Sequence, residues 1–235
     1  MKIRCVWEHN GNDSMLYSSN FVGAFSRGES KEIALSKMQD EIKAYLRWKS
    51  GETVTDLEVD VDEEWSSTLD ICDADSDAIF TKEKEPLTLD EYLELKELAL
   101  KSAQDFLKLY HSVPDKHSSI IPAKNTFLGP KPRTAFEMYE HTKSVNSYYF
   151  GEIDVPADNE GDIYECRKRG FELLEKQDDF LKNKVLVGSY DEQWSVRKVL
   201  RRFIWHDRIH GKAMYRMAIK TFGEGAVPDV FRFEN

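Results

Sequence analysis

The sequence predicts an α+β protein in which a small sheet carrying one helix precedes an all-helical domain. Between residues 1 and 65, short runs of alternating or β-branched apolar side chains flank a single segment with helical periodicity. From Leu87 onward, the apolar residues of four segments recur three and four positions apart, which is typical of amphipathic helices. We therefore expect a β-β-β-α-β domain at residues 1–72 and a four-helix bundle at residues 87–235, joined by a polar linker at residues 73–86.

The charged residues divide the chain in the same way. Residues 1–80 carry 17 acidic and 8 basic side chains, whereas residues 81–235 carry 26 and 25. An acidic first half, within a net charge of −10, argues against nucleic-acid binding because phosphate contacts require the opposite sign. We expect some cations of the last helix to meet the acidic domain, either within one chain or across a homodimer.

Composition predicts a globular, cytoplasmic protein. The 40% of hydrophobic residues and 12% of aromatic residues are enough to build a core. Three widely separated cysteines, Cys5, Cys72 and Cys166, form neither a C-x-x-C motif nor a complete disulfide set, which predicts a reducing compartment. The first residues lack the apolar segment of a signal peptide, and no apolar run is long enough to span a bilayer, so we expect no membrane association.

Turn and cap residues separate the expected elements of the first domain. Gly11 to Asp13 predicts a turn between the first two strands. Ser30 suits the N-cap of a helix that extends to Lys49, and Gly51 follows as its terminator. The four expected strands are Lys2–Trp7, Met15–Ser18, Phe21–Phe25 and Val54–Val61.

The junction of the third strand with the helix, F-V-G-A-F-S-R-G-E-S-K-E-I-A-L, and the end of the helix, K-A-Y-L, resemble the HicB-like fold over residues 1–65. The resemblance implies a domain of the kind that antitoxins use to bind a small toxin partner. The separate DNA-binding segment that many such proteins carry has no counterpart in this sequence. Fold alone does not assign function, so an accessory or oligomerising role is the alternative that we favour for this domain.

Three of the four helices expected in the second domain begin with capping-box spacing, in which a Ser or Thr precedes a Glu by three residues. These pairs are Thr88 and Glu91, Thr134 and Glu137, and Ser189 and Glu192. The expected helices run from Thr88 to about Tyr110, from Ala135 to about Phe150, from about Asp162 to Leu181, and from near Tyr190 to before Gly223.

Two histidines lie one turn apart on the apolar face of the last helix. His206 and His210 are four residues apart, which places their Cβ atoms about 5–6 Å apart, so both rings can reach one ion. His141 lies on the apolar face of the second helix of the bundle. Three neutral imidazoles with an open position for water form the ligand set of a catalytic zinc site, and nickel or iron(II) also suits them. The alternative is that all three are core or interface histidines with hydrogen-bonded rings.

The segments around these histidines, E-H-T-K-S-V and R-R-F-I-W-H-D-R-I-H-G-K-A, resemble the DinB-like superfamily from Leu87 to the end of the chain. That superfamily includes the bacillithiol transferases and mycothiol-dependent enzymes. The resemblance implies that His141, His206 and His210 ligate a divalent metal, with zinc as the first expectation. It does not fix a substrate, because reactions vary widely among proteins of this fold.

Two further residues are candidates for catalytic roles. Arg202 lies one turn before His206 on the same face, where its guanidinium could grip a carboxylate or phosphate of an anionic substrate. Glu137 lies one turn before His141 and could accept a hydrogen bond from an imidazole or act as a base. The alternatives are an ion pair between Arg202 and Glu137, or a capping role for Glu137. Asp207 is expected to point away from the ligand face, as is Arg208, toward the surface or a partner.

The sequence therefore predicts a divalent-metal-dependent enzyme of the thiol-transferase or hydrolase kind, with a metal-activated thiol or water as nucleophile. Its expected substrate is a low-molecular-weight thiol or a small anion. The alternative is a non-enzymatic binding protein, in which the HicB-like domain recognises a protein partner and the metal is structural or absent.

Overall fold

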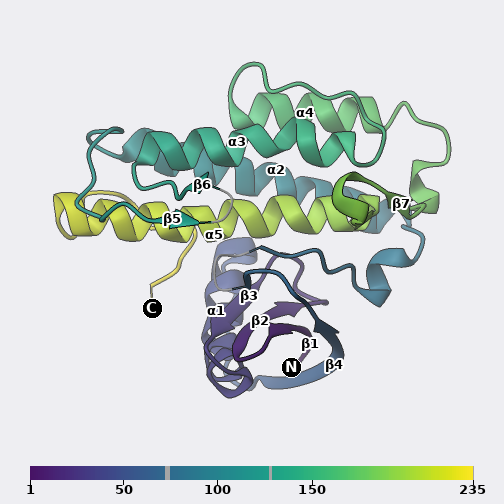
Figure 1. The fold of residues 1–235 in the computed structure, drawn as a ribbon, viewed down its shortest axis with the longest axis horizontal. Coiled ribbons are helices and arrows are strands. Elements are labelled where there is room, and N and C mark those ends of the chain that lie inside the picture. The colour runs from purple at the N-terminus through teal and green to yellow at the C-terminus, as the bar shows by residue number, and fades with distance from the viewer. Residues whose placement is uncertain (72–74, 127–128, 235) are drawn as a thin grey trace.

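The sheet and the helices predicted from the sequence are both present in the computed structural model, which describes residues 1–71, 75–126 and 129–234. The chain is α+β, with its sheet before its long packed helices (Figure 1). We call residues 1–71 the sheet region and the described residues after Pro86 the helical region. Cys72 lies outside the described residues, as do the first two residues of the expected linker.

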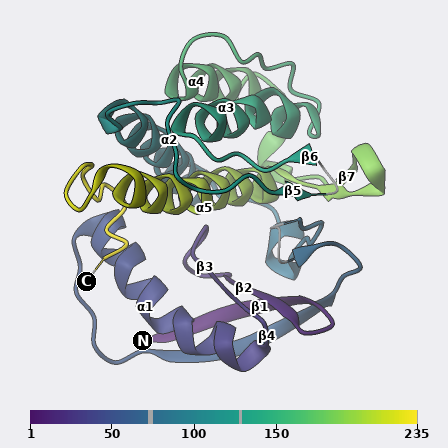
Figure 2. The ribbon, with the colours of Figure 1, turned by 60° about the vertical axis from the view of Figure 1, so that its left-hand side comes forward.

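The sheet region consists of β1 (Lys2–Asn10), β2 (Asp13–Ser18), β3 (Phe25–Gly28), α1 (Lys31–Ser50) and β4 (Glu58–Ser66), which confirms the predicted order of elements. β1 pairs antiparallel with β2 and parallel with β4, and β2 pairs antiparallel with β3. The sheet order is therefore β3-β2-β1-β4. α1 packs against this sheet, and its apolar side chains share a buried core with those of β1 and β2 (Figure 2).

The third strand begins where the sequence predicts its end. Residues 19–23 form bends and a turn instead of a strand, and Gly23 has a φ of +91°. A Cβ atom at Gly23 would lie 2.2 Å from Cγ2 of Ile204 on the last helix, so a side chain there would collide with the helical region. The position of this turn is thus set by a tertiary contact that strand propensity does not report.

The fourth strand also begins later than expected, at Glu58 instead of Val54. Glu58 is the partner of Lys2, the first residue of β1, so the residues before Glu58 extend past the start of their neighbouring strand. The caps predicted for α1 are confirmed. The hydroxyl of Ser30 accepts a hydrogen bond from an amide of the first turn, and Gly51 follows the helix in the left-handed conformation.

The described part of the helical region contains four α-helices, α2 (Leu89–Ser112), α3 (Ala135–Gly151), α4 (Ile163–Leu174) and α5 (Val196–Phe222). They pack side by side, with α4 and α5 each in contact with both α2 and α3 (Figure 1). Two short ladders lie in the connections between them. Their strands are β5 (Asn125–Thr126), β6 (Gly129–Pro130), β7 (Leu186–Val187) and β8 (Gln193–Trp194).

The two predicted capping boxes at the starts of α2 and α3 are confirmed. In each, the Thr hydroxyl accepts a hydrogen bond from the Glu amide, and the Glu carboxylate accepts one from the Thr amide. The pairs are Thr88 with Glu91 and Thr134 with Glu137. Each box satisfies two backbone donors that the first turn of a helix leaves without partners.

The third predicted capping box is wrong. α5 begins after Ser195, whose hydroxyl caps the helix, and Ser189–Asp191 forms a separate 3-10 turn in which Tyr190 has a φ of +60°. The predicted end of α4 at Leu181 is also wrong. The helix stops at Leu174, and the chain passes through Asp179 in the left-handed conformation before a second 3-10 turn.

α5 lies between the other helices and the sheet region (Figures 1 and 2). Both of its sides are therefore covered along its first half, and the charged side chains from Arg197 to Arg208 are buried. Asp207 is ion-paired with Arg167 of α4 and accepts a hydrogen bond from Ser102 of α2. Arg208 faces the opposite way and is ion-paired with Glu41 of α1, at 2.6 Å. The prediction that Asp207 and Arg208 lie at the surface is wrong, because a helix covered on both sides has no solvent-facing stripe at these positions.

Contacts of α5 with the sheet region are both charged and apolar. Glu41 accepts from Arg208 and lies 3.4 Å from the amino group of Lys212, which confirms that cations of the last helix meet the acidic first half of the chain. The indole of Trp205 meets the rings of Phe25 and Tyr17 edge-on, at centroid distances of 6.4 and 6.0 Å. The two regions thus share a continuous interior.

The described part of the expected linker is packed against the rest of the protein. Ala78, Ile79 and Phe80 are buried. The 3-10 turn that follows, Thr81–Lys84, places the carboxylate of Glu83 in an ion pair with Arg201 of α5. Through these buried residues and this ion pair, the segment between the two regions packs against α5.

We expect the Glu41→Ala variant to have a free energy of unfolding about 3–5 kcal/mol lower than that of the wild type, because the variant leaves the buried guanidinium of Arg208 without a counter-charge. Urea unfolding followed by circular dichroism measures this difference. The matched control is Glu172→Ala, which removes an exposed i,i+4 pair with Lys168 and should change the free energy by less than about 0.5 kcal/mol. Equal effects of the two variants would contradict the buried-pair interpretation.

Candidate metal centre

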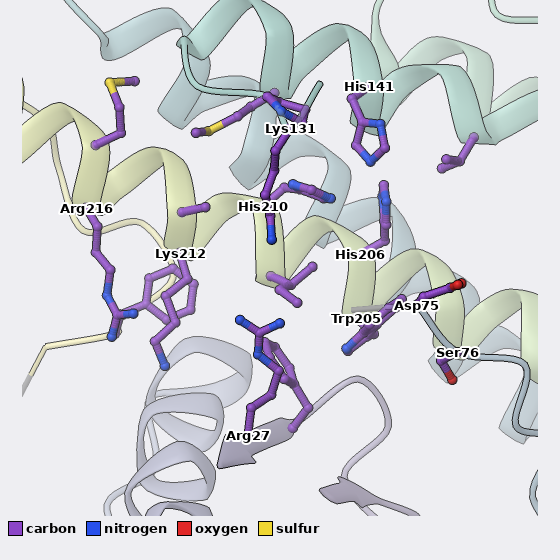
Figure 3. A pocket seen from close by; sticks show the side chains of 18 of the residues that line it. Arg27, Asp75, Ser76, Lys131, His141, Trp205, His206, His210, Lys212 and Arg216 are labelled. Atoms are coloured by element: carbon purple, nitrogen blue, oxygen red, sulfur yellow. The ribbon is translucent and has the colours of Figure 1, made fainter. Parts of the chain in front are cut away.

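The structure brings the three predicted histidines together. His206 and His210 lie one turn apart on α5, and His141 lies on α3, which packs against α5. One ring nitrogen from each of the three lies within 4.8 Å of the others. The ring centroids are 4.4–5.1 Å apart, and all three side chains point into a common space (Figure 3). This convergence comes from two helices, as a bundle site requires.

Burial keeps these imidazoles unprotonated. It lowers the pKa of His210 to about 3, with the neighbouring His141 as a further cause, and lowers the pKa of His141 below its ordinary value. The pKa of His206 lies well below its ordinary value, first because the ring is buried and then because the other two histidines and Arg202 disfavour added positive charge. All three rings are therefore neutral at pH 7, which leaves one lone pair on each for a metal.

One ring nitrogen also lacks a hydrogen-bond partner. Nδ1 of His206 is buried and makes no hydrogen bond within the described residues. A buried polar atom without a partner costs about 1–3 kcal/mol, so such atoms in native proteins usually serve a ligand, an ion or a water. In this site a bound ligand would offset that penalty.

The donor set fits a borderline transition metal. Three neutral nitrogens suit zinc, nickel or iron(II), whereas magnesium and calcium require oxygen ligands. Ligand nitrogens about 2.1 Å from a tetrahedral ion lie about 3.4 Å apart. The nitrogens here span up to 4.8 Å, so loading requires the three side chains to rotate slightly toward one another. Three protein ligands leave a coordination position for a non-protein group.

The histidines line a cavity of about 970 Å³ between α3, α5 and the sheet region. Tyr148 and Tyr149 of α3 contribute to one side of it, and Trp205 and Ile209 of α5 to another. On the sheet-region side, Arg27 extends toward the histidines (Figure 3). The cavity is large enough for a small organic molecule next to the three imidazoles.

Arg202 lies at this cavity, one turn before His206, as predicted. Its guanidinium is 3.4 Å from the carboxylate of Glu192 and lies 5.5 Å from the ring centroid of Trp194 and 5.6 Å from that of Tyr149. The acidic partner of Arg202 is therefore Glu192, and not Glu137 as considered from the sequence. The sequence missed this partner because Glu192 matched the spacing of a capping box.

Glu137 has the capping role. Its Oε2 accepts hydrogen bonds from the backbone amides of Arg133 and Thr134, at 2.8 and 3.0 Å, and these bonds lower the pKa of its carboxyl group. Glu137 is not among the described residues that line the cavity. Among the described residues, Glu137 makes no hydrogen bond with a histidine ring, so the contact considered from the sequence is not present.

Residues that the sequence did not single out complete the cavity. Asp75 and Ser76, from the segment expected as a linker, lie on the same side as Trp205 and His206 (Figure 3). Arg27 and Lys131 come from a strand and a connection that are more than 100 positions apart in the chain. A spacing of that kind leaves no local pattern, so only the tertiary structure reveals these neighbours.

No protein-family model, curated protein or solved structure matches this chain. Among the described residues, no helix is both long enough and apolar enough to cross a membrane.

We expect the metal-free protein to lose stability as the pH falls from 7 to 5. Unfolding returns His206 to a pKa near 6.5, so in this range the unfolded chain binds a proton that the folded chain does not. This contribution is fully present above about pH 6.5 and decreases by about 2 kcal/mol by pH 5. Urea unfolding in the presence of a chelator measures it.

The His206→Gln variant is the control for this pH dependence, because it keeps a neutral polar side chain and removes the titrating group. Its loss of stability between pH 7 and 5 should be smaller than that of the wild type by about 2 kcal/mol. Identical losses in the two proteins would mean that His206 does not have a lowered pKa in the folded state.

Proposed function

We propose that this protein is a divalent-metal-dependent enzyme whose metal, zinc in the first instance, is held by His141, His206 and His210. The observation that carries the proposal is the convergence of three neutral imidazoles from two helices at the wall of a cavity. Nickel and iron(II) fit the same nitrogen donors. A purely structural zinc usually has four protein ligands, and three groups converge in this cluster among the described residues.

The chemistry we propose is that of a thiol transferase or a hydrolase. When bound, a divalent ion lowers the pKa of a coordinated water or thiol, which creates a nucleophile at neutral pH. The chain's own residues hold and orient the reactants. Burial keeps the three imidazoles unprotonated, and Arg202 holds a permanent positive charge at the cavity wall, where it can orient an anionic group of the substrate. Trp205 and Tyr149 restrict access of water from their sides of the cavity.

Sequence and architecture both support this class of enzyme. The segment R-R-F-I-W-H-D-R-I-H resembles the DinB-like superfamily, which implies metal ligands at His141, His206 and His210. The described part of the helical region packs four helices, of which α3 carries His141 and α5 carries the other two histidines. We propose a DinB-like bundle for the helical region and a HicB-like fold for the sheet region on these grounds. The proposed substrate is a low-molecular-weight thiol or a small anion.

The alternative, a non-enzymatic module in which the sheet region binds a protein partner, has less support. Helix α1 of the sheet region contacts α5 through the buried ion pair of Glu41 and Arg208. The turn at Gly23 packs against Ile204, and Phe25 meets Trp205. These faces of the sheet region are already occupied by the helical region.

The metal site is tested by elemental analysis of the protein purified without a histidine tag. We expect about one zinc, nickel or iron per chain. In His206→Ala, which removes one of three ligands, we expect at least about 100-fold weaker binding of added zinc, measured by competition with a chromophoric chelator. His111→Ala, which removes an exposed histidine at the end of α2, is the control and should bind zinc as the wild type does. A wild type that binds zinc no better than His206→Ala would exclude the site.

An enzymatic site is distinguished from a structural one by cobalt substitution. We expect the visible spectrum of the cobalt-loaded protein to change when a small thiol is added, with a new thiolate-to-cobalt charge-transfer band, because a coordination position is open. Acetate, which lacks the thiol, should not produce that band. A spectrum that neither thiol nor acetate alters would indicate a closed, structural site.

A further inference from the structure

The cavity beside the histidines is strongly cationic although the protein as a whole is acidic. Of the described residues that line it, eight are lysine or arginine and three are aspartate or glutamate. Two of the eight cations are ion-paired within the protein, Arg202 with Glu192 and Lys212 with Glu41. Two of the three carboxylates are also already neutralised within the protein. Glu41 pairs with Arg208, and Asp40 lies 3.3 Å from Lys43. In a chain with a net charge of −10, this concentration of positive charge requires an explanation.

Two of the cations reach the histidines from opposite sides. Arg27 belongs to β3 of the sheet region, and Lys131 belongs to the connection that leads to α3. Both extend their charged ends toward His210 (Figure 3). The sheet region therefore supplies one side of the cavity, next to the proposed metal, and is more than an accessory to the helical region.

The positive charge continues away from the histidines along α5. Lys212, Arg216 and Lys220 are spaced four residues apart, so they form a row on one face of the helix. From His210 to Lys220 the row covers ten residues, or about 15 Å at 1.5 Å per residue. Like charges at this spacing destabilise a helix. Lys212 lies 3.4 Å from the carboxylate of Glu41, whereas Arg216 and Lys220 have no ion-pair partner among the described residues.

Three residues that line the cavity also have a buried hydrogen-bond donor without an acceptor. Nε1 of Trp205, Nε of Arg202 and Nε of Arg133 are each buried and unpartnered within the described residues. The side chains of Trp and Arg can only donate, so the partner that satisfies them must be an acceptor. Leaving each donor unmet costs about 1–3 kcal/mol. Because these donor atoms are covered, the lysine and arginine side chains that line the cavity are the stronger argument for an anionic ligand.

We infer that the substrate is an elongated small molecule with at least two phosphate or carboxylate groups, bound between the sheet region and α5. One anionic group lies next to the histidines, between Arg27 and Lys131, and the other lies along Lys212, Arg216 and Lys220. This inference rests on the proposed function, because it names the substrate class of that site. A nucleic acid is the less favourable polyanion, since the negative charge of the whole protein repels a long phosphate backbone.

The test compares two sugars that differ by one phosphate. Isothermal titration calorimetry at low salt, with the full-length, chelator-treated protein, measures binding of fructose 1,6-bisphosphate and of fructose 6-phosphate. Omitting the metal prevents the probes from acting as its chelators. We expect the bisphosphate to bind at least about tenfold more tightly, because its second phosphate gains charge-assisted hydrogen bonds.

Three variants locate the binding. Arg27→Gln and Arg216→Gln should each weaken bisphosphate binding about tenfold, at opposite ends of the cavity. Lys108→Gln, which removes an exposed cation of α2 outside the cavity, should leave it unchanged within about twofold. Because Arg216 is exposed, its substitution should preserve the fold, and circular dichroism checks this for every variant.

Equal affinities for the two sugars would overturn the inference, as would variants that bind like the wild type. It would also be overturned if a single-stranded oligonucleotide bound more tightly than the bisphosphate and with the same sensitivity to Arg216→Gln. The zinc content of the untreated preparation separates this outcome from a failure of the proposed function. A protein with one zinc and no preference for the bisphosphate loses only the substrate class, and a protein with the preference but without metal loses only the metal site.

Discussion

The covering of α5 on both sides is the constraint on which the rest of the structure depends. The first half of this helix carries buried basic residues on several faces, and each buried charge requires a partner. Asp207 is satisfied by Arg167 from the helical region, whereas Arg208 is satisfied by Glu41 from the sheet region. The two regions cannot separate without leaving Arg208 and Glu41 unpaired. This pair, together with the contacts of Trp205 and Ile204 with the sheet region, sets their mutual orientation and with it the cavity at the histidines.

The same constraint explains why the histidines can be close and neutral. α3 packs on one face of α5 and places His141 opposite His206 and His210, and the ring of Tyr149 meets that of His206. Three positive charges in such a place would repel one another and lack solvation, so the rings remain uncharged. Unprotonated nitrogens are the state in which a metal binds without displacing protons. The fold thus brings together three nitrogens that suit the metal we propose.

Local signals in the sequence predicted much of this arrangement. The order of the sheet elements, the caps of α1, α2 and α3, and the long last helix followed from periodicity and from residues such as Ser30 and Thr134. The histidine pair was predictable because its spacing matches the helical repeat, and His141 because it shares the apolar face of its own helix. Each of these depends on neighbours within a few residues along the chain.

The residues whose surroundings were predicted wrongly, or not at all, have their contacts with residues that are distant in the sequence. Asp207 and Arg208 look solvent-facing when α5 is considered alone, since a helix with one partner buries one stripe. Glu192 has capping spacing with Ser189, but an arginine and a lysine of α5 bind its carboxylate. Arg27 becomes a neighbour of the histidines only when the sheet region packs on α5. Periodicity contains no information on such pairings.

The metal that we propose is held by three imidazoles, those of His141, His206 and His210. X-ray absorption at the zinc edge of the loaded, full-length protein reports the ligand atoms themselves. We expect three imidazole nitrogens at about 2.0–2.1 Å, plus a fourth light atom from a non-protein ligand. A shell containing sulfur at about 2.3 Å, or the same spectrum from the His206→Ala variant, would contradict it.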